Sequence, residues 1–285
     1  MLQTQDAMRT RLLRGLPVTT RHLDIDGIST QVLEGGQGPS LLLLHGGIEA
    51  GGVYWAPVLS RLTEQYRVVV PDVPGLGESA PLARLDTDTF AGWFATLLHR
   101  TCPDGAALVA HSLNGSLAAR FAADHGEQLR RLVIIGAPGL GRFHLPPGLA
   151  VASMRCTVHP SERNLRRFLP WPFLDWQRTA AQEPQWFESF TAYMVSCQRV
   201  PHAGRAMRQL LKAGTSRIPD AQLRRISVPT TLIWGRHDRM VPLRIAEDAG
   251  TRFGWPLHVI DNSGHVPFVE QPAAFLTALE EELGS

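Results

Sequence analysis

The sequence is poor in lysine, in cysteine and in long apolar runs, and each shortage narrows the classes of function that the chain can have. Lys212 is the only lysine among the 285 residues, so Schiff-base chemistry has a single candidate. The three cysteines, Cys102, Cys156 and Cys197, are too few and too scattered for a disulfide framework or a zinc site. No apolar run approaches the roughly 20 residues that a membrane-spanning helix requires. We therefore expect no zinc site and no membrane partner.

Charge is nearly balanced, with 28 basic and 26 acidic side chains and a net charge of +2. That balance gives no electrostatic reason to expect a nucleic-acid partner. The first 16 residues carry Arg9, Arg11 and Arg14 but no uninterrupted apolar stretch, so we expect no secretory signal and a cytoplasmic location. We interpret the first 25 residues or so as a polar tail that leads into the first strand. Nothing in the sequence indicates an oligomeric state.

Short, continuous apolar runs alternate with segments of helical length and period. Such runs are typical of strands buried on both faces of a parallel sheet, and their alternation with helices predicts a doubly wound α/β fold with flanking helices. An earlier segment, Ser29–Glu34, alternates polar and apolar residues and favours an antiparallel strand. The expected strands are 21–25, 29–34, 41–44, 68–70, 106–110, 132–135, 231–234 and 257–260, and the expected helices are 54–64, 89–100, 113–124, 243–253 and 273–283.

One interval, residues 138–227, contains no buried-strand run and is too long for a simple connection. It is rich in arginine, proline and aromatic residues, including Trp171, Phe173 and Trp176. We interpret it as a helical lid inserted between two parts of an α/β core, residues 1–137 and 228–285. An all-helical second domain with no role at the site is the alternative.

The sharpest local signal surrounds Ser112. A buried strand ends at Ala110, His111 and Ser112 follow, and an alanine-rich helix begins at once. This strand–turn–helix setting is that of a nucleophile elbow, a tight turn that needs small residues two positions either side of the serine. Ala110 meets this need upstream, whereas Asn114 stands where glycine is expected and predicts adjusted packing behind the turn. The plainer interpretation is a serine that caps the following helix.

A serine hydroxyl needs a base, and the base needs an acid that orients it. His265 lies in a loop just after the last strand, and Asp238 lies just after the strand before it. A solvent-exposed loop histidine and a helix-start aspartate are the plainer interpretations. Because both loops follow the carboxyl ends of parallel strands, we expect the two side chains to meet Ser112 at one edge of the sheet. The chain order Ser112, Asp238, His265 is that of α/β-hydrolases.

Acyl transfer also needs hydrogen-bond donors for the oxyanion. The turn His45-Gly46-Gly47 follows a buried strand, and its glycines let backbone N–H groups approach a substrate closely. We expect the N–H groups of Gly47 and Leu113 to be these donors. His45 itself is expected to be structural.

With these residues in hand, the chain resembles the α/β-hydrolase superfamily from about Arg21 to Leu283. The turn Asp72–Ser79 is similar to the D-x-P-G-x-G-x-S turn of lid-bearing members, where it shapes the floor of the site. Gly264-His265 followed by Pro267 and Glu270 resembles the final loop and helix entry of these proteins. The resemblance implies a lid inserted after the sixth strand.

The resemblance also separates subclasses of the superfamily. Dehalogenases and epoxide hydrolases of this fold use an aspartate nucleophile, where this chain has Ser112. The glycine-rich turn is reminiscent of the meta-cleavage-product hydrolases, which cut C–C bonds in ring-fission dienoates. Those enzymes carry asparagine before the serine, tryptophan after the histidine and Gly-Pro-Gly in the turn. This chain instead has His111, Val266 and Ile48-Glu49-Ala50.

The leading hypothesis is therefore a serine hydrolase that cleaves a small or medium, largely apolar carboxylic ester through an acyl-enzyme on Ser112. Its partner is a small-molecule ester, and its mechanism needs no metal and no organic cofactor. A C–C hydrolase of dienoates and an acyltransferase with the same triad are the alternatives. A ligand-binding module on this fold is a third, less favoured because a pure binder has no need of an intact triad.

Overall fold

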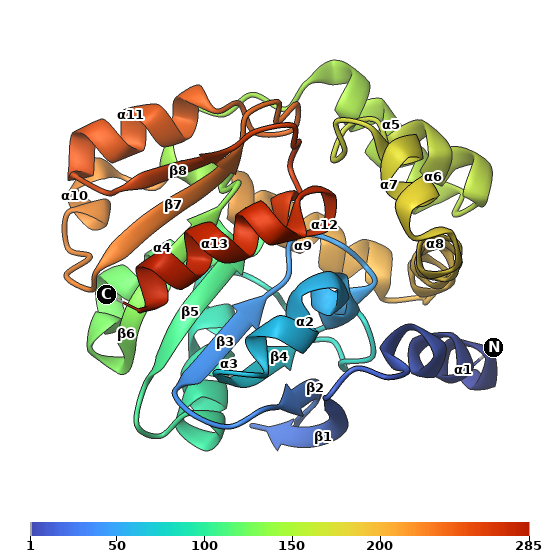
Figure 1. Cartoon of the computed structure of the whole chain (residues 1–285), viewed down its shortest axis with the longest axis horizontal. Helices are drawn as coiled ribbons and strands as arrows, with labels where there is room; N and C mark the ends of the chain where they lie inside the picture. Colours follow the sequence, from blue (N-terminus) through green and yellow to red (C-terminus); the bar gives the residue numbers. More distant parts are fainter. Residues whose placement is uncertain (1, 285) are drawn as a thin grey trace.

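An eight-stranded sheet runs through the middle of the computed structural model, which describes residues 2–284 (Figure 1). Its strand order is β1-β2-β4-β3-β5-β6-β7-β8, and β3 to β8 are parallel, whereas β2 pairs antiparallel with both β1 and β4. The strands are β1 (Thr19–Ile25), β2 (Ile28–Gly35), β3 (Ser40–Leu44), β4 (Arg67–Pro71), β5 (Ala106–His111), β6 (Leu129–Ile135), β7 (Thr230–Gly235) and β8 (Leu257–Ile260). The predicted mostly parallel α/β sheet is confirmed, including its early antiparallel strand.

Helices cover both faces of the sheet, as expected for a doubly wound fold. On one face lie a short 3-10 turn (Gly51–Trp55), α2 (Ala56–Leu62), α12 (Pro267–Glu270) and α13 (Pro272–Leu283). On the other lie α3 (Thr87–Thr101), α4 (Ser112–His125) and α11 (Arg244–Phe253). Successive residues of a strand point to opposite faces of the sheet. Leu41 and Leu43 therefore join the apolar core under α2 and α13, and Leu42 and Leu44 join the core under α3 and α4. This double burial is why the strands are continuously apolar in sequence.

The interval 138–227 connects β6 to β7, and the regular structure in it consists of helices joined by loops. Its helices are α5 (Pro147–Val158), α6 (Glu162–Phe168), α7 (Trp176–Gln182), α8 (Pro184–Gln198), α9 (Ala203–Thr215) and α10 (Asp220–Leu223). Helices α5 to α8 form a separate layer beyond one end of the sheet, whereas α9 and α10 pack against α4 (Figure 1).

The expectation of a polar N-terminal tail is wrong. Residues Leu2–Leu13 form α1, which packs against α8 (Figure 1). Its apolar face is small, with Leu12 buried against the α2 side of the sheet, so hydrophobic periodicity gives almost no sign of it. Arg9, placed in the polar tail, is in fact only 2% exposed. No helix among residues 2–284 is long and apolar enough to cross a membrane.

Candidate active site

Ser112 occupies a strained turn between β5 and α4. Its φ angle is +57°, in the left-handed region that a side chain other than glycine rarely adopts. The strain lifts the side chain above the carboxyl end of the sheet, where Ser112 remains only 6% exposed. The turn has the backbone conformation expected of a nucleophile elbow.

Ser112, His265 and Asp238 form one chain of hydrogen bonds. The Ser112 Oγ lies 2.8 Å from Nε2 of His265, and Nδ1 of His265 lies 2.7 Å from Oδ2 of Asp238. An ionised carboxylate only accepts hydrogen bonds, so Nδ1 donates, and Nε2 is left to accept from the serine hydroxyl. Oδ1 of Asp238 accepts from the N–H groups of Met240 and Val241, each at 2.8 Å, which fixes the carboxylate.

Gly136, which follows β6, makes room for the imidazole. Its φ is +60°, and a Cβ atom there would lie 2.7 Å from Cε1 of His265. Glycine therefore meets two demands at this position, a left-handed backbone and a close approach. The histidine is held by backbone packing as well as by Asp238.

The loop that carries His265 is tied to the 138–227 interval by hydrogen bonds. The His265 N–H donates to the carbonyl of Pro172 at 2.8 Å. Glu270, which is 6% exposed, accepts from the N–H groups of Gly264 at 2.6 Å and Leu174 at 2.7 Å. Burial raises the pKa of Glu270, although these N–H groups oppose the rise. Glu270 therefore joins the histidine loop to the chain segment between α6 and α7.

Gly47 and Leu113, the expected oxyanion donors, lie side by side. A Cβ atom on Gly47 would come within 2.5 Å of Cδ1 of Leu113, and both residues line a cavity together with Ser112. As the second residue of α4, Leu113 has an N–H with no acceptor in its own helix. The structure thus brings all five predicted site residues to one place.

Two residues on either side of Ser112 hold the site together: Asn114, which replaces the glycine expected of the elbow, and His111, which stands where the meta-cleavage-product hydrolases carry asparagine. The Asn114 side chain donates to the carbonyl of His45 at 2.6 Å, which ties the elbow to the glycine turn. His111 donates through Nε2 to the carbonyl of His265 at 2.9 Å, and the two rings lie 4.6 Å apart. Burial, and then the neighbouring His265, hold the pKa of His111 well below its usual value, so its ring is neutral.

His45 serves as a brace, in agreement with its expected structural role. Its Nδ1 donates to the carbonyl of Gly46 at 2.7 Å, and its Nε2 accepts from the N–H of Val73 at 2.9 Å. Burial lowers the pKa of His45 and keeps the ring neutral. The glycine turn is thereby fastened to the Asp72–Ser79 turn beneath it.

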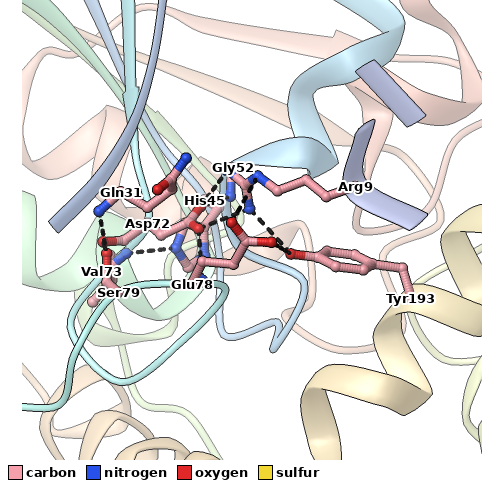
Figure 2. Close-up of polar contacts among 9 residues, drawn as sticks. All are labelled: Arg9, Gln31, His45, Gly52, Asp72, Val73, Glu78, Ser79 and Tyr193. Carbon is pink, nitrogen blue, oxygen red and sulfur yellow. Dashed lines mark hydrogen bonds and ion pairs between the residues drawn. The ribbon is translucent and has the colours of Figure 1, made fainter. Parts of the chain in front are cut away.

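A buried ionic network lies behind this floor (Figure 2). Asp72, which is 0% exposed, accepts from the N–H groups of Gly52 and Glu78 and from Arg9 of α1, the last at 2.8 Å. The Arg9 guanidinium also donates to the Tyr193 hydroxyl of α8 at 3.1 Å, and that hydroxyl donates to Glu78 at 3.3 Å. Sequence reasoning missed Arg9 and Tyr193, because 63 and 184 positions separate Arg9 from Asp72 and Tyr193.

Two cavities meet at Ser112. The smaller has a volume of about 90 Å³ and the larger about 300 Å³, and Gly47, Met207 and Met240 line both. The larger is mostly apolar; its walls include Phe143, Leu145, Leu149, Met154, Val158 and Leu211. The smaller is more polar and includes Glu49, Tyr54, His111, Cys156 and Gln198. We call them the large chamber and the small chamber.

The chain belongs to the alpha/beta hydrolase family, whose model matches residues 41–278. A pimeloyl-(acyl-carrier protein) methyl ester esterase of Vibrio atlanticus is 28% identical over 258 residues, which cover 86% of this chain and 94% of that protein. A 2-hydroxymuconate semialdehyde hydrolase of a Pseudomonas species is also 28% identical and covers 94% of each chain. A carboxylesterase from Bacillus subtilis shares the fold, with a TM-score of 0.83, 23% identity and coverage of 100% of this chain and 97% of its own. The protein is thus a hydrolase with esterases among its relatives.

Proposed function

We propose that this protein is a serine hydrolase that cleaves a small or medium, largely apolar carboxylic ester through an acyl-enzyme on Ser112. The observation that carries the proposal is the unbroken chain of hydrogen bonds from Ser112 through His265 to Asp238. A serine in this arrangement has a base for its proton, and the base has a fixed tautomer.

In the acylation step, Nε2 of His265 takes the hydroxyl proton while Oγ of Ser112 forms a bond to the ester carbonyl carbon. The carbonyl oxygen becomes an oxyanion and accepts from the N–H groups of Gly47 and Leu113. The C–O bond to the leaving alcohol then breaks, and the imidazolium gives its proton to the alcohol oxygen. Asp238 stays ionised throughout and stabilises the imidazolium.

In the deacylation step, water replaces the alcohol. His265 takes a proton from the water, whose oxygen attacks the acyl carbon. The bond to Oγ breaks, Ser112 regains its proton from His265, and the carboxylic acid leaves. The same oxyanion donors serve both steps, and the loss of one such donor typically slows a reaction about 10²–10³-fold.

The walls of the large chamber support an apolar acyl group. Several of these walls come from α5 and α6, including Leu149, Met154 and Phe168. We therefore propose that residues 138–227 act as a lid that selects the substrate, set between core segments 1–137 and 228–285. All three cysteines are buried free thiols, which supports a cytoplasmic, reducing setting.

The small chamber disfavours the C–C hydrolase alternative. A dienoate carries a carboxylate, and of the described residues that line this chamber none is lysine or arginine, while Glu49 is an acid. Arg208 lines only the large chamber, among apolar side chains. A buried carboxylate without a cation is costly, so an uncharged ester fits the site better.

The test is Ser112→Ala, assayed on p-nitrophenyl esters of graded chain length. We expect turnover to fall by about a millionfold, the loss typical of a nucleophile in a well-built triad. Ser60→Ala, which changes an exposed serine of α2, is the matched control. A fluorophosphonate probe should label the wild type and the control but not Ser112→Ala. Wild-type turnover by Ser112→Ala would refute the nucleophile, and a dienoate turned over far faster than any ester would favour the C–C hydrolase.

A further inference from the structure

The two chambers are not equivalent with respect to the reacting groups. His265 lines the small chamber and not the large one, whereas Leu113 lines the large chamber and not the small one. Since His265 must hand its proton to the departing oxygen, the leaving alcohol belongs on the small-chamber side. The acyl chain then extends into the large chamber. This orientation rests on the proposed ester hydrolysis.

Two polar side chains of the small chamber have hydrogen-bonding capacity to spare. Gln198, at the end of α8, is 8% exposed, and its Oε1 has no hydrogen-bond partner in the described residues. Its Nε2 donates to Oε2 of Glu49 at 3.3 Å, a long bond. A buried carbonyl oxygen that accepts no hydrogen bond costs free energy, and a ligand hydroxyl within hydrogen-bond distance of this oxygen would recover that free energy.

Glu49 is the second of these groups. It stands in the Ile48-Glu49-Ala50 segment, and its backbone carbonyl is fixed by the N–H of Gly77 at 2.8 Å. Burial raises the pKa of the Glu49 carboxyl, and hydrogen bonds from its own backbone N–H and from Gln198 only partly oppose this. Of the described residues that line the chamber none is lysine or arginine, so the acid faces the ligand space without a permanent counter-charge.

We propose that Glu49 and Gln198 form a specificity site for the leaving group, in which Oε1 of Gln198 accepts a hydrogen bond from an alcohol that carries a further hydroxyl and Glu49 disfavours an anionic group. The substrates are then monoacyl esters of a small diol or triol, with the fatty or aryl acyl chain in the large chamber. An anionic leaving group is rejected, because it would face Glu49 with no cation to pair with it. Hydrolysis releases the free acid and the polyol.

The experiment compares three octanoate esters on the wild-type enzyme: propyl, 2-hydroxyethyl and carboxymethyl. Propyl and 2-hydroxyethyl groups have nearly the same size and differ in a methyl against a hydroxyl. We expect kcat/KM to favour 2-hydroxyethyl over propyl by about 10- to 100-fold, the range for satisfying a buried acceptor that is otherwise left without a partner. We expect carboxymethyl octanoate to be slower than the propyl ester.

Substitutions then assign the preference to the two side chains. Gln198→Leu should bring the 2-hydroxyethyl to propyl ratio down toward one, and Glu49→Gln should narrow the gap between the propyl and carboxymethyl esters. Gln185→Leu, at an exposed position of the same helix, is the matched control and should keep the wild-type ratios. The ratio compares two esters on the same enzyme, so a loss of folded protein in a variant does not change it.

The inference is overturned if the wild type hydrolyses propyl and 2-hydroxyethyl octanoate at equal kcat/KM while the fluorophosphonate probe still labels Ser112. A preference that survives in Gln198→Leu equally overturns it. Failure of the proposed function has a different signature, because Ser112→Ala would then retain turnover or no ester would be cleaved by the wild type. The two failures are therefore distinguishable.

Discussion

Replacing Arg9 by methionine tests whether α1 is an integral part of this fold. Arg9 is 2% exposed, and its guanidinium lies 2.8 Å from Asp72 and 3.7 Å from Glu78 and donates to Tyr193 at 3.1 Å. Methionine fills much of the same space without charge, so the variant leaves the Asp72 carboxylate buried without its cation. Removing one partner of a buried ion pair typically costs about 3–5 kcal/mol.

The lower end of that range applies to Arg9, because Asp72 keeps the N–H groups of Gly52 and Glu78. We therefore expect Arg9→Met to lower the free energy of unfolding by about 3 kcal/mol, and a loss of this size lowers Tm by roughly 6–12 °C in a domain of 150–250 residues. Urea and thermal unfolding followed by circular dichroism measure both quantities. Burial raises the pKa of Glu78 and Arg9 opposes that rise, so the variant should raise this pKa further.

Two controls make the Arg9 result specific. Arg11→Met removes an exposed arginine of the same helix and should change stability by less than about 0.5 kcal/mol. Tyr193→Phe should cost about 1 kcal/mol, and a double-mutant cycle with Arg9→Met should show coupling between the two residues. If Arg9→Met is as stable as Arg11→Met, the pairing with Asp72 does not hold the fold, and α1 is the tail that the sequence indicates.

Three further variants test the site. Glu49→Gln should be more stable than the wild type at pH 8 and lose this advantage near pH 4.5, as urea midpoints at both pH values would reveal. Burial raises the folded-state pKa of Glu49, so the contribution of Glu49 to folding stability is complete at low pH and is lost as the pH rises through that raised pKa. Gly136→Ala should lower kcat by about 100-fold or more, because the added Cβ displaces His265. The control Gly92→Ala adds a Cβ with no neighbouring atom within 4 Å and should not lower kcat, so equal kcat in the two variants would contradict this role of Gly136. Glu270→Gln places an amide where the N–H groups of Gly264 and Leu174 need acceptors, so the free energy of unfolding should fall by about 1–3 kcal/mol. Its kcat should also fall by a larger factor than its KM rises, and a change in stability alone would mean that Glu270 does not position His265.

The elements that local patterns predict correctly are those whose sequence and environment repeat. The inner parallel strands are buried on both faces and follow or precede a helix, so apolar runs such as Leu41–Leu44 mark them within about three residues. The elbow is also local, because strand, serine and helix are contiguous. Helix α1 lacks such a signal, because the contact that anchors it to the fold is made by the buried Arg9 and not by a row of apolar side chains. Its partner carboxylate lies 63 positions away, and no periodicity encodes that contact.

The departures from the family pattern explain why the sequence indicates the chemistry more fully than the substrate. His111 and Asn114 flank the elbow. His111 donates a hydrogen bond to the carbonyl of His265 and Asn114 donates one to the carbonyl of His45, so both residues preserve the geometry of the reacting groups. Glu49 differs, because it faces the small chamber and its neighbour Gln198 comes from a helix 149 positions away. A change that fixes the proposed triad leaves the reaction as it was, whereas an acid beside the proposed leaving-group site alters which alcohol can leave. On the proposed orientation, selectivity depends on a pairing between the glycine turn and the end of α8, which only the folded chain brings together.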